Sequence, residues 1–526
     1  MALPRAAPPA ASATVRRVPA AAVRAPAAPS SPAPRPATPW LALGAIAVLA
    51  AVLRFATLRT QSIWFDEAAT WDLVRRPFGT MLSRLPDGES NPPLFYVLEW
   101  LWTRVFGDGE FGLRSLSALA GLLTVPVAYA IGRRVAAVRA GLAGAALVAV
   151  NPLLVWFSQE ARSYALATLL SAVALLAFVH ALDDRRARVL IAWVPAAVLA
   201  LATHYFTAFV LVPQALWLLW RHPRRRAALA AVGAVALAGI ALLPLLIAQS
   251  GNPYDIAGTS LALRLAQVPK QFLLGYRGPL GLPFGLLGAA LVAGGAWLLA
   301  RRTPRPARER ALLLAAIGAV GVALPLVAAL LGADYLNARN LLPALIPLLA
   351  ALAVGCAVSD APRLGGALLA ALCALSLAIV VVVARDAQYQ RQDWRGLAHA
   401  LGSDDAARAL VITPANGELA LRYYLPGLRM MGGAGARVDE VDVVTVAGSP
   451  DPGKAPELSP LSGPALGVPG FGRPRETRTG TYALLRFRAA AAGSTAVPVV
   501  PDPLGVLRYG ERFPSVDVLP EGDQAG

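Results

Sequence analysis

Two adjacent carboxylates follow the first apolar block of the chain directly. Asp66 and Glu67 lie in the segment SIWFDEAATW (62–71), where Trp64 and Trp71 are expected to hold the backbone at the membrane–water boundary. One interpretation is that Asp66 acts as a general base at the level of a lipid headgroup. The same pattern also fits a structural role, with Asp66 as the N-cap of an interfacial helix and Glu67 stabilising its positive end. The two roles are compatible.

A second group of polar residues lies at 158–164, in the sequence SQEARSY. Ionisable side chains this close to an apolar block are costly unless they pair with each other or serve a function. Glu160 and Arg162 therefore either form an ion pair that closes a tight turn, or act in chemistry. In the second case, Glu160 positions an acceptor or a metal ion and Arg162 binds a phosphate.

Two further candidates flank apolar blocks: THYF (203–206) and DYLNARN (334–340). A lone histidine in such a place is more often a satisfied structural residue than a ligand; the functional alternative is that His204 and Tyr205 position an acceptor or a metal ion. The planar guanidinium of Arg339 suits bidentate phosphate recognition, although an arginine at a helix end can also extend its charge to the interface. No metal motif of recognised spacing and no glycine-rich nucleotide loop occurs in the sequence.

The composition indicates what must hold these residues in place. The chain has 526 residues, of which 56% are hydrophobic and 15% charged, whereas a soluble domain carries roughly 25% charged residues. The apolar residues form blocks of about 17–22 residues, long enough to cross a bilayer as helices. Cys356 and Cys373 both lie inside such blocks, so neither a disulfide framework nor a cysteine metal site is expected. The sequence predicts an α-helical polytopic membrane protein.

Eleven apolar blocks are predicted to span the membrane: 40–57, 113–132, 140–157, 163–182, 189–203, 207–220, 227–248, 279–300, 311–332, 340–358 and 364–384. The segment 92–106 is also apolar, but its length gives only about 22 Å of helix against a hydrocarbon core of roughly 30 Å. Glu99 and Thr103 are four residues apart and place one polar stripe on this helix. That pattern favours a helix lying in the interface.

The basic residues test this topology. With 92–106 excluded, sixteen arginines fall in loops assigned to the cytoplasm: Arg133, Arg134, Arg139, Arg185, Arg186, Arg188, Arg221, Arg224, Arg225, Arg226, Arg301, Arg302, Arg305, Arg308, Arg310 and Arg363. In the outer loops between the later spans there are five basic residues: Arg162, Arg264, Lys270, Arg277 and Arg339. Because Lys and Arg concentrate in cytoplasmic loops, the N-terminus is predicted inside and the long first outer loop (58–112) outside. The net charge of +17 thus reflects topology and does not indicate a nucleic-acid partner.

Three regions are expected along the chain. Residues 1–38 are rich in Pro and Ala and should form a disordered basic cytoplasmic tail. Residues 39–384 hold the spans and the candidate site. Residues 385–526 contain no spanning block and are expected to form a small α/β-like domain on the outer face. Its predicted elements are helices at 393–402 and 416–424, strands at 408–413, 441–446 and 481–488, and a Gly/Pro-rich loop at 448–478.

The candidate segments resemble the GT-C superfamily of glycosyltransferases, most closely the branch with protein O-mannosyltransferases (family 39) and the aminoarabinose transferases of lipid A. SIWFDEAAT, the stretch from NPPLFYVLEW to GRRV (91–135) and NPLLVWFSQEARSYAL (151–166) carry the resemblance. THYF, YLNARNLLPALIPLL and QRQDWRGLAHAL are similar to actinobacterial-type members. The resemblance covers about 40–400, and 91–166 is its most specific part.

The resemblance implies an inverting transferase in the plasma membrane that uses a polyprenyl-phosphate-linked sugar. The sugar, mannose or a pentose, would pass to a protein, polysaccharide or glycolipid acceptor on the outer face. The aspartate of the family's first outer loop is the catalytic base and matches Asp66, while Glu67 completes that motif. The second-loop acidic position matches Glu160, and Arg162 and Arg339 would lie near the lipid phosphate. Some relatives use a divalent metal and others do not, so the resemblance leaves the cofactor open.

Other functions fit parts of the same pattern. A transporter or flippase for a lipid-linked saccharide would place ionisable residues in mid-membrane, often on broken helices of repeated units. Here the candidates lie at the ends of blocks and no internal repeat is apparent. A ligase that moves a whole glycan from a pyrophosphate lipid, and a non-catalytic assembly subunit, are further alternatives.

Overall fold

The computed structural model describes residues 39–184, 186–250, 259–402, 408–413, 417–428, 436–447, 470–489 and 495–497. The tail predicted for 1–38, and most of the loop predicted for 448–478, lie outside these ranges.

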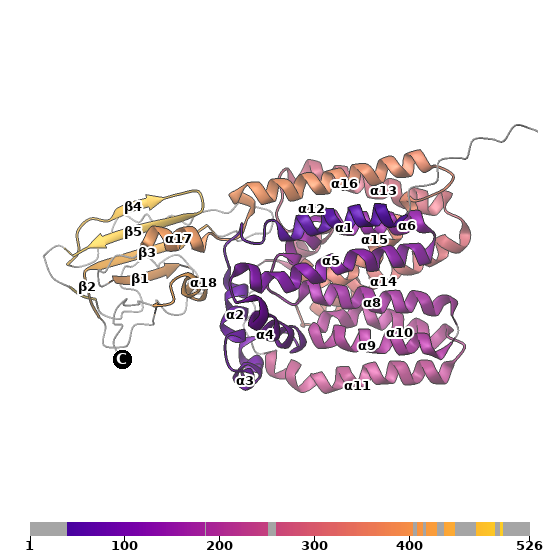
Figure 1. The fold of residues 1–526 in the computed structure, drawn as a ribbon, viewed down its shortest axis with the longest axis horizontal. Helices are drawn as coiled ribbons and strands as arrows, with labels where there is room; N and C mark the ends of the chain where they lie inside the picture. Colours follow the sequence, from indigo (N-terminus) through magenta and orange to yellow (C-terminus); the bar gives the residue numbers. More distant parts are fainter. Residues whose placement is uncertain are drawn as a thin grey trace, which may run out of the picture. The chain divides into compact units, whose positions relative to one another are not determined.

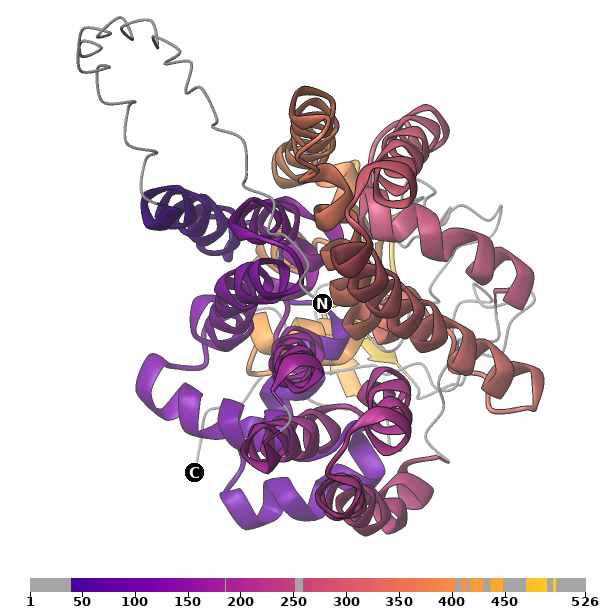
Figure 2. The ribbon, with the colours of Figure 1, turned by 90° about the vertical axis from the view of Figure 1, so that its right-hand side faces the viewer.

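Long apolar helices run side by side and form most of the structure (Figure 1), and Figure 2 shows many of them end-on. They are α1 (Pro39–Phe55), α5 (Glu110–Val135), α6 (Val138–Val150), α7 (Pro152–Ser158), α8 (Tyr164–Asp183), α9 (Ala187–Thr203), α10 (Ala208–Arg221), α11 (Arg225–Gln249), α13 (Gly281–Arg302), α14 (Arg305–Leu330), α15 (Leu342–Cys356) and α16 (Pro362–Arg385).

The predicted count of eleven spans is not confirmed, although every predicted span coincides with a helix or a helix pair. Among the described residues, seven helices are long and apolar enough to cross a membrane, or eight if the bent pair α6–α7 counts as one. The helices α1 and α9 are apolar but have 17 residues each, and α10 has 14. A straight span needs about 20 residues.

The break between α6 and α7 positions the second predicted site segment. Pro152 occupies the first turn of α7, and the Asn151 side chain caps that turn by accepting the Leu154 N–H at 3.1 Å. The two helices meet at 59°. The carbonyls of Val148 and Ala149 at the end of α6 accept hydrogen bonds from the buried Arg54 guanidinium, at 3.1 and 2.9 Å. The direction of α7, and with it the position of residues 159–163 that follow, therefore depends on this break.

Three short helices fill the segment between α1 and α5: α2 (Phe65–Val74), α3 (Phe78–Gly88) and α4 (Leu94–Phe106). The 13 residues of α4 give about 20 Å, too short to cross a bilayer, as the length argument predicted. Its polar stripe faces inward, since Glu99 and Thr103 are buried while Leu101 and Val105 are exposed. The reason is packing: α4 contacts α2 and α5.

The chain after α16 forms an α/β unit, as predicted. Its elements are α17 (Trp394–Leu401), β1 (Arg408–Thr413), α18 (Gly417–Tyr424), β2 (Ala436–Val438), β3 (Glu440–Val446), β4 (Arg475–Arg478), β5 (Tyr482–Arg488) and β6 (Thr495–Val497). The main sheet has the order β1-β3-β5-β4, with β1 and β3 parallel and the other pairs antiparallel. Strand β4 lies in the stretch predicted as loop; it is a fully exposed edge strand of sequence RETR, which lacks the alternation of a strand pattern.

Two apolar clusters organise the described residues. The larger one lies among the long helices. The smaller one joins α2–α4 to the C-terminal region: Phe95 and Tyr96 belong to it together with Trp394 and Leu421, all of them fully buried. The helix α12 (Leu261–Leu274), which precedes α13, was not predicted.

Candidate active site

Asp66 lies in the first turn of α2 and is held by an arginine that is distant in sequence. Trp64 occupies the N-cap position, so the interpretation of Asp66 as an N-cap is wrong. Asp66 Oδ2 lies 3.0 Å from Arg339 Nη1, and the two side chains are 17% and 16% exposed. The fold thus brings together the predicted base and one of the predicted phosphate-binding arginines.

The local sequence explains how Arg339 is presented. The 3-10 turn η2 (Ala338–Leu341) precedes α15, and the Asn337 side chain accepts the Arg339 N–H at 3.2 Å. Asn340 Nδ2 donates to the Tyr335 carbonyl at 2.9 Å. Two asparagines therefore fix the turn that carries the guanidinium. The Arg339 guanidinium carbon lies 5.9 Å from the centroid of the Tyr164 ring.

A cavity with an empty volume of about 580 Å³ opens beside Arg339. Its lining includes Asn91, Tyr164, His204, Tyr205, Tyr335 and Arg339. This Arg339 cavity therefore collects residues from five separate parts of the sequence, and three of the predicted site residues are among them.

His204 and Tyr205 line this cavity in different ways. His204 Nδ1 accepts the Phe206 N–H at 3.2 Å. Burial, together with the charges of Arg162 and Arg339, lowers the pKa of His204 to about 3. The imidazole is therefore neutral, with its proton on Nε2. The Tyr205 hydroxyl donates to Gln249 Oε1 at 2.8 Å.

Glu67 turns away from the cavity and is fully buried. Its two oxygens accept hydrogen bonds from Arg114 at 2.7 and 2.5 Å, and Oε1 also accepts the Ala161 N–H at 3.0 Å. Burial acts to raise the pKa of Glu67, but the Arg114 guanidinium outweighs it and holds the pKa below its usual value. The geometry favours a positioning role for Glu67: it ties α2 to α5 and to the 159–163 segment.

Glu160 and Arg162 do not pair with each other, contrary to the first interpretation of their segment. The tight turn exists, since the Arg162 N–H donates to the Glu160 carbonyl at 2.8 Å. However, Glu160 pairs with Arg391 at 2.9 Å and Arg162 with Glu89 at 2.9 Å. Arg162 Nη1 also donates to the Asp66 carbonyl at 3.4 Å. Arg162 is not among the residues that line the Arg339 cavity.

Comparisons with known proteins show similarity to one family model and to several solved structures. Residues 90–248 match the family model of dolichyl-phosphate-mannose-protein mannosyltransferase. No curated protein matches the chain in sequence. The crystal structure of ArnT from Cupriavidus metallidurans, bound to undecaprenyl phosphate, has a TM-score of 0.50 at 15% identity and covers 86% of this chain and 98% of that one. Residues 90–248 thus resemble this mannosyltransferase family, and the chain shares the fold of ArnT.

Two other solved structures match with lower TM-scores. The Saccharomyces cerevisiae protein O-mannosyltransferase Pmt1-Pmt2 complex, bound to its sugar donor, has a TM-score of 0.31 at 22% identity, over 40% of this chain and 32% of that one. The archaeal oligosaccharyltransferase AglB from Archaeoglobus fulgidus, in complex with an inhibitory peptide and a dolichol-phosphate, has a TM-score of 0.43 at 13% identity, over 73% of this chain and 63% of that one.

Several residues around the candidate site were not predicted. Arg114 is the most important, because its side chain is fully buried and holds Glu67. Its signal was an arginine just inside a predicted span, where an ionisable residue needs a partner. Glu89 and Arg391 carried no comparable local signal. Arg395 pairs with Glu110 at 2.6 Å and so ties α17 to the start of α5.

A metal centre needs several ligand side chains close together. In the part of the chain that the structure describes, no three His, Cys, Asp or Glu side chains come close enough to hold a metal ion. Glu160 is instead engaged by Arg391, and His204 uses Nδ1 for the Phe206 N–H. The geometry therefore assigns neither residue to a metal.

The Glu160 carboxyl makes the stability of the folded chain depend on pH. Burial raises the pKa of Glu160 from 4.5 to about 7, against the opposing charge of Arg391 and with a contribution from the charges of Glu67 and Asp66. Because the folded chain binds this proton more tightly than the unfolded chain, the stabilisation is complete below about pH 4.5 and is lost as the pH rises through about 7.

We therefore expect the melting temperature of the wild type to fall, relative to that of a Glu160→Gln variant, between about pH 4.5 and 7. The amide keeps the size of the side chain and does not titrate. Thermal unfolding of the two detergent-solubilised proteins across this range measures the difference. Parallel curves would contradict the prediction.

Proposed function

We propose that this chain is an inverting glycosyltransferase that moves a sugar from a polyprenyl-phosphate donor to a hydroxyl on the outer face of the plasma membrane. The observation that carries the proposal is the contact between Asp66 and Arg339 at the Arg339 cavity. One group can take a proton and the other can bind a phosphate. The lipid carriers held by ArnT and AglB support a donor of this class.

The bond changes follow from the placement of these groups. The acceptor oxygen attacks C1 of the sugar from the side opposite the phosphate, while Asp66 takes the hydroxyl proton. The C1–O bond breaks, its electron pair leaves with the polyprenyl phosphate, and the configuration at C1 inverts. Arg339 stabilises the charge that grows on this phosphate. Asp66 ends protonated and releases its proton to solvent.

The remaining candidates have supporting roles in this mechanism. Neutral His204 offers Nε2–H to a hydroxyl or phosphate oxygen in the cavity, and Tyr205 forms part of the wall beside it. Arg162 and Glu67 hold the backbone and the helix of Asp66. Glu160 keeps Oε1 without a hydrogen-bond partner among the described residues, which suits a group that positions the acceptor.

The distribution of arginines supports the orientation of the proposed enzyme. The sixteen arginines of the predicted cytoplasmic loops, against five basic residues in the outer loops between the later spans, favour an inside N-terminus and an outer C-terminal region. Eleven crossings, with α1, α9 and α10 inserted as short spans where the bilayer thins locally, are consistent with this orientation. The sugar would be mannose or a pentose, and the acceptor a protein, polysaccharide or glycolipid.

Incubation of the purified protein with radiolabelled polyprenyl-phosphate sugars tests the proposal. A transferase releases free polyprenyl phosphate only when acceptor is present. Movement of intact labelled lipid across a vesicle bilayer, without release, would instead identify a transporter or flippase. Transfer from pyrophosphate-linked glycans alone would identify a ligase.

Arg339 provides a second check on the mechanism. Replacement by Ala is expected to lower the transfer rate by about 10²–10³-fold, because it removes a preorganised donor from the leaving phosphate. Arg339→Lys should restore part of the loss, since it keeps the charge but not the planar fork. Initial rates with labelled donor measure both variants. Equal rates for Ala and wild type would remove Arg339 from the mechanism.

A further inference from the structure

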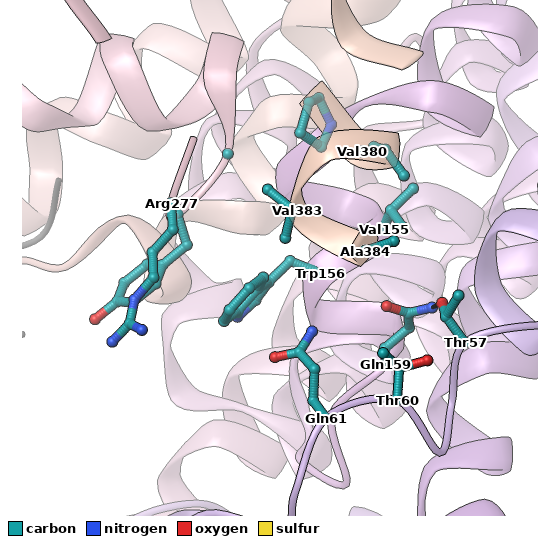
Figure 3. A pocket seen from close by; sticks show the side chains of 13 residues that line it. Thr57, Thr60, Gln61, Val155, Trp156, Gln159, Arg277, Val380, Val383 and Ala384 are labelled. Atoms are coloured by element: carbon teal, nitrogen blue, oxygen red, sulfur yellow. Dashed lines mark hydrogen bonds between the residues drawn. The ribbon is translucent and has the colours of Figure 1, made fainter. Parts of the chain in front are cut away.

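A second cavity, with an empty volume of about 440 Å³, lies among the ends of several helices and shares no lining residue with the Arg339 cavity (Figure 3). We call it the Trp156 cavity. Gln61 follows α1, Trp156 lies in α7, Arg277 lies in the loop between α12 and α13, and Val380 and Val383 lie in the last turns of α16. Four separate segments therefore build it.

The lining combines aromatic, neutral polar and cationic groups. The rings of Trp156 and Tyr276 lie 5.8 Å apart at an interplanar angle of 31°. Gln61 and Gln159 add amide groups, and none of the lining residues is acidic. The only charged side chain of the lining is Arg277.

Arg277 has no carboxylate partner among the residues that the structure describes. Its Nη1 donates to the Gln390 carbonyl. A second guanidinium, that of Arg391, lies 4.5 Å from the centroid of the Trp156 ring and adds to the positive potential, although Glu160 pairs with it. A partly buried guanidinium without an acid is complementary to an anion, and it binds phosphate oxygens particularly well.

The position of the cavity indicates where the anion comes from. Trp156 and the lining residues of α16 lie in the final turns of their helices, and Trp and Tyr at such ends are typical of the headgroup level of a bilayer. The helix α13, which follows the Arg277 loop, exposes Leu282 and Leu286 by 75% and 64%. Acyl chains can therefore lie against the protein immediately beside the charged group.

We infer that the Trp156 cavity binds the phosphate-bearing headgroup of an anionic membrane lipid, with Arg277 as the cation that holds it. Trp156 and Tyr276 flank the headgroup, and the valines of α16 contact the first carbons of the chains. This lipid is not the sugar donor, which the proposed function places in the Arg339 cavity. The inference stands whether or not the chain transfers sugars.

The test uses the full-length protein in a neutral detergent and three added probes: phosphatidylglycerol, phosphatidylcholine and inorganic phosphate. Native mass spectrometry counts bound lipid, and the melting temperature reports binding because a ligand of the folded state stabilises it. Phosphatidylglycerol should be retained and should raise the melting temperature. The other two probes should have little effect.

Arg277→Gln removes the charge but keeps a donor for the Gln390 carbonyl. We expect it to weaken phosphatidylglycerol binding by about tenfold, the effect of losing a charge-assisted hydrogen bond. Arg277→Lys should retain most of the binding. Arg84→Gln, which changes an exposed arginine of α3, serves as the matched control and should bind like the wild type.

Ala384→Trp provides a second variant that fills the cavity without touching the cation, and it should also reduce binding. Equal phosphatidylglycerol binding by wild type, Arg277→Gln and Ala384→Trp would overturn the inference. Displacement of the lipid by equimolar inorganic phosphate would also overturn it, because the site would then recognise a soluble anion. None of these outcomes depends on transferase activity. The inference about the Trp156 cavity can therefore fail while the proposed function holds, and the reverse is also true.

Discussion

Replacement of Asp66 by Asn is expected to lower the rate of sugar transfer by roughly 10²–10⁴-fold, the usual contribution of a general base. The amide has the same shape and can still accept a hydrogen bond from Arg339 Nη1, which lies 3.0 Å from Oδ2 in the wild type. It cannot take a proton from the acceptor. Donor binding should therefore persist while chemistry stops.

The measurement is the initial rate of transfer from labelled donor, together with donor binding by the same preparation. Asp72→Asn is the matched control: Asp72 lies on the same helix, its side chain is 35% exposed, and it pairs with Arg76 at 2.6 Å. It should retain wild-type activity. Wild-type rates from a folded Asp66→Asn protein would exclude Asp66 as the base.

Replacement of Arg114 by Met is expected to have the largest effect on stability. The Arg114 guanidinium is buried and donates to Glu67 and to the carbonyls of Leu58, Gln61 and Ser62, at 2.5–2.8 Å. Its removal leaves a buried carboxylate and three carbonyls without their donor. Breaking one side of a buried ion pair costs about 3–5 kcal/mol in the free energy of unfolding.

We expect Arg114→Met to lower the yield of folded protein and the melting temperature in detergent. Arg59→Met changes an exposed arginine of the same segment and should stay within about 0.5 kcal/mol of the wild type. The double variant Glu67→Gln with Arg114→Met should recover part of the loss, because it leaves no buried charge. An unchanged melting temperature for Arg114→Met would show that the segment before α2 does not depend on this side chain.

The sequence predicted most elements of the fold, although not α12 or β4, and it predicted one long-range proximity at the candidate site. Apolar blocks located the helices, and the arginine distribution placed Asp66 and Arg339 on one side of the membrane although 273 residues separate them. Those two side chains do meet. Hydropathy locates the helices, and the distribution of charge indicates which helix ends lie on the same side of the membrane. Together they therefore predict that these two residues share one face.

Hydropathy and charge do not predict which individual side chains pair with each other. Glu160 and Arg162 share a tight turn, yet their side chains diverge to partners 231 and 73 residues away. Which partner each finds depends on the angle at which α7 leaves α6 and on where the chain after α16 returns. The same limit applies to α4: its length was sufficient to reject a span, but packing decided that Glu99 faces inward.

The contact between Asp66 and Arg339 has a consequence for the order of events. In the structure without substrates, the carboxylate is neutralised by the guanidinium that is proposed to hold the donor phosphate. A phosphate that arrives at Arg339 competes for the same N–H groups and releases Asp66. Asp66 then becomes available as a base only after the donor has bound, so the kinetics should be sequential with donor binding first. An acceptor or a water molecule that arrives before the donor meets an aspartate that is still paired with Arg339.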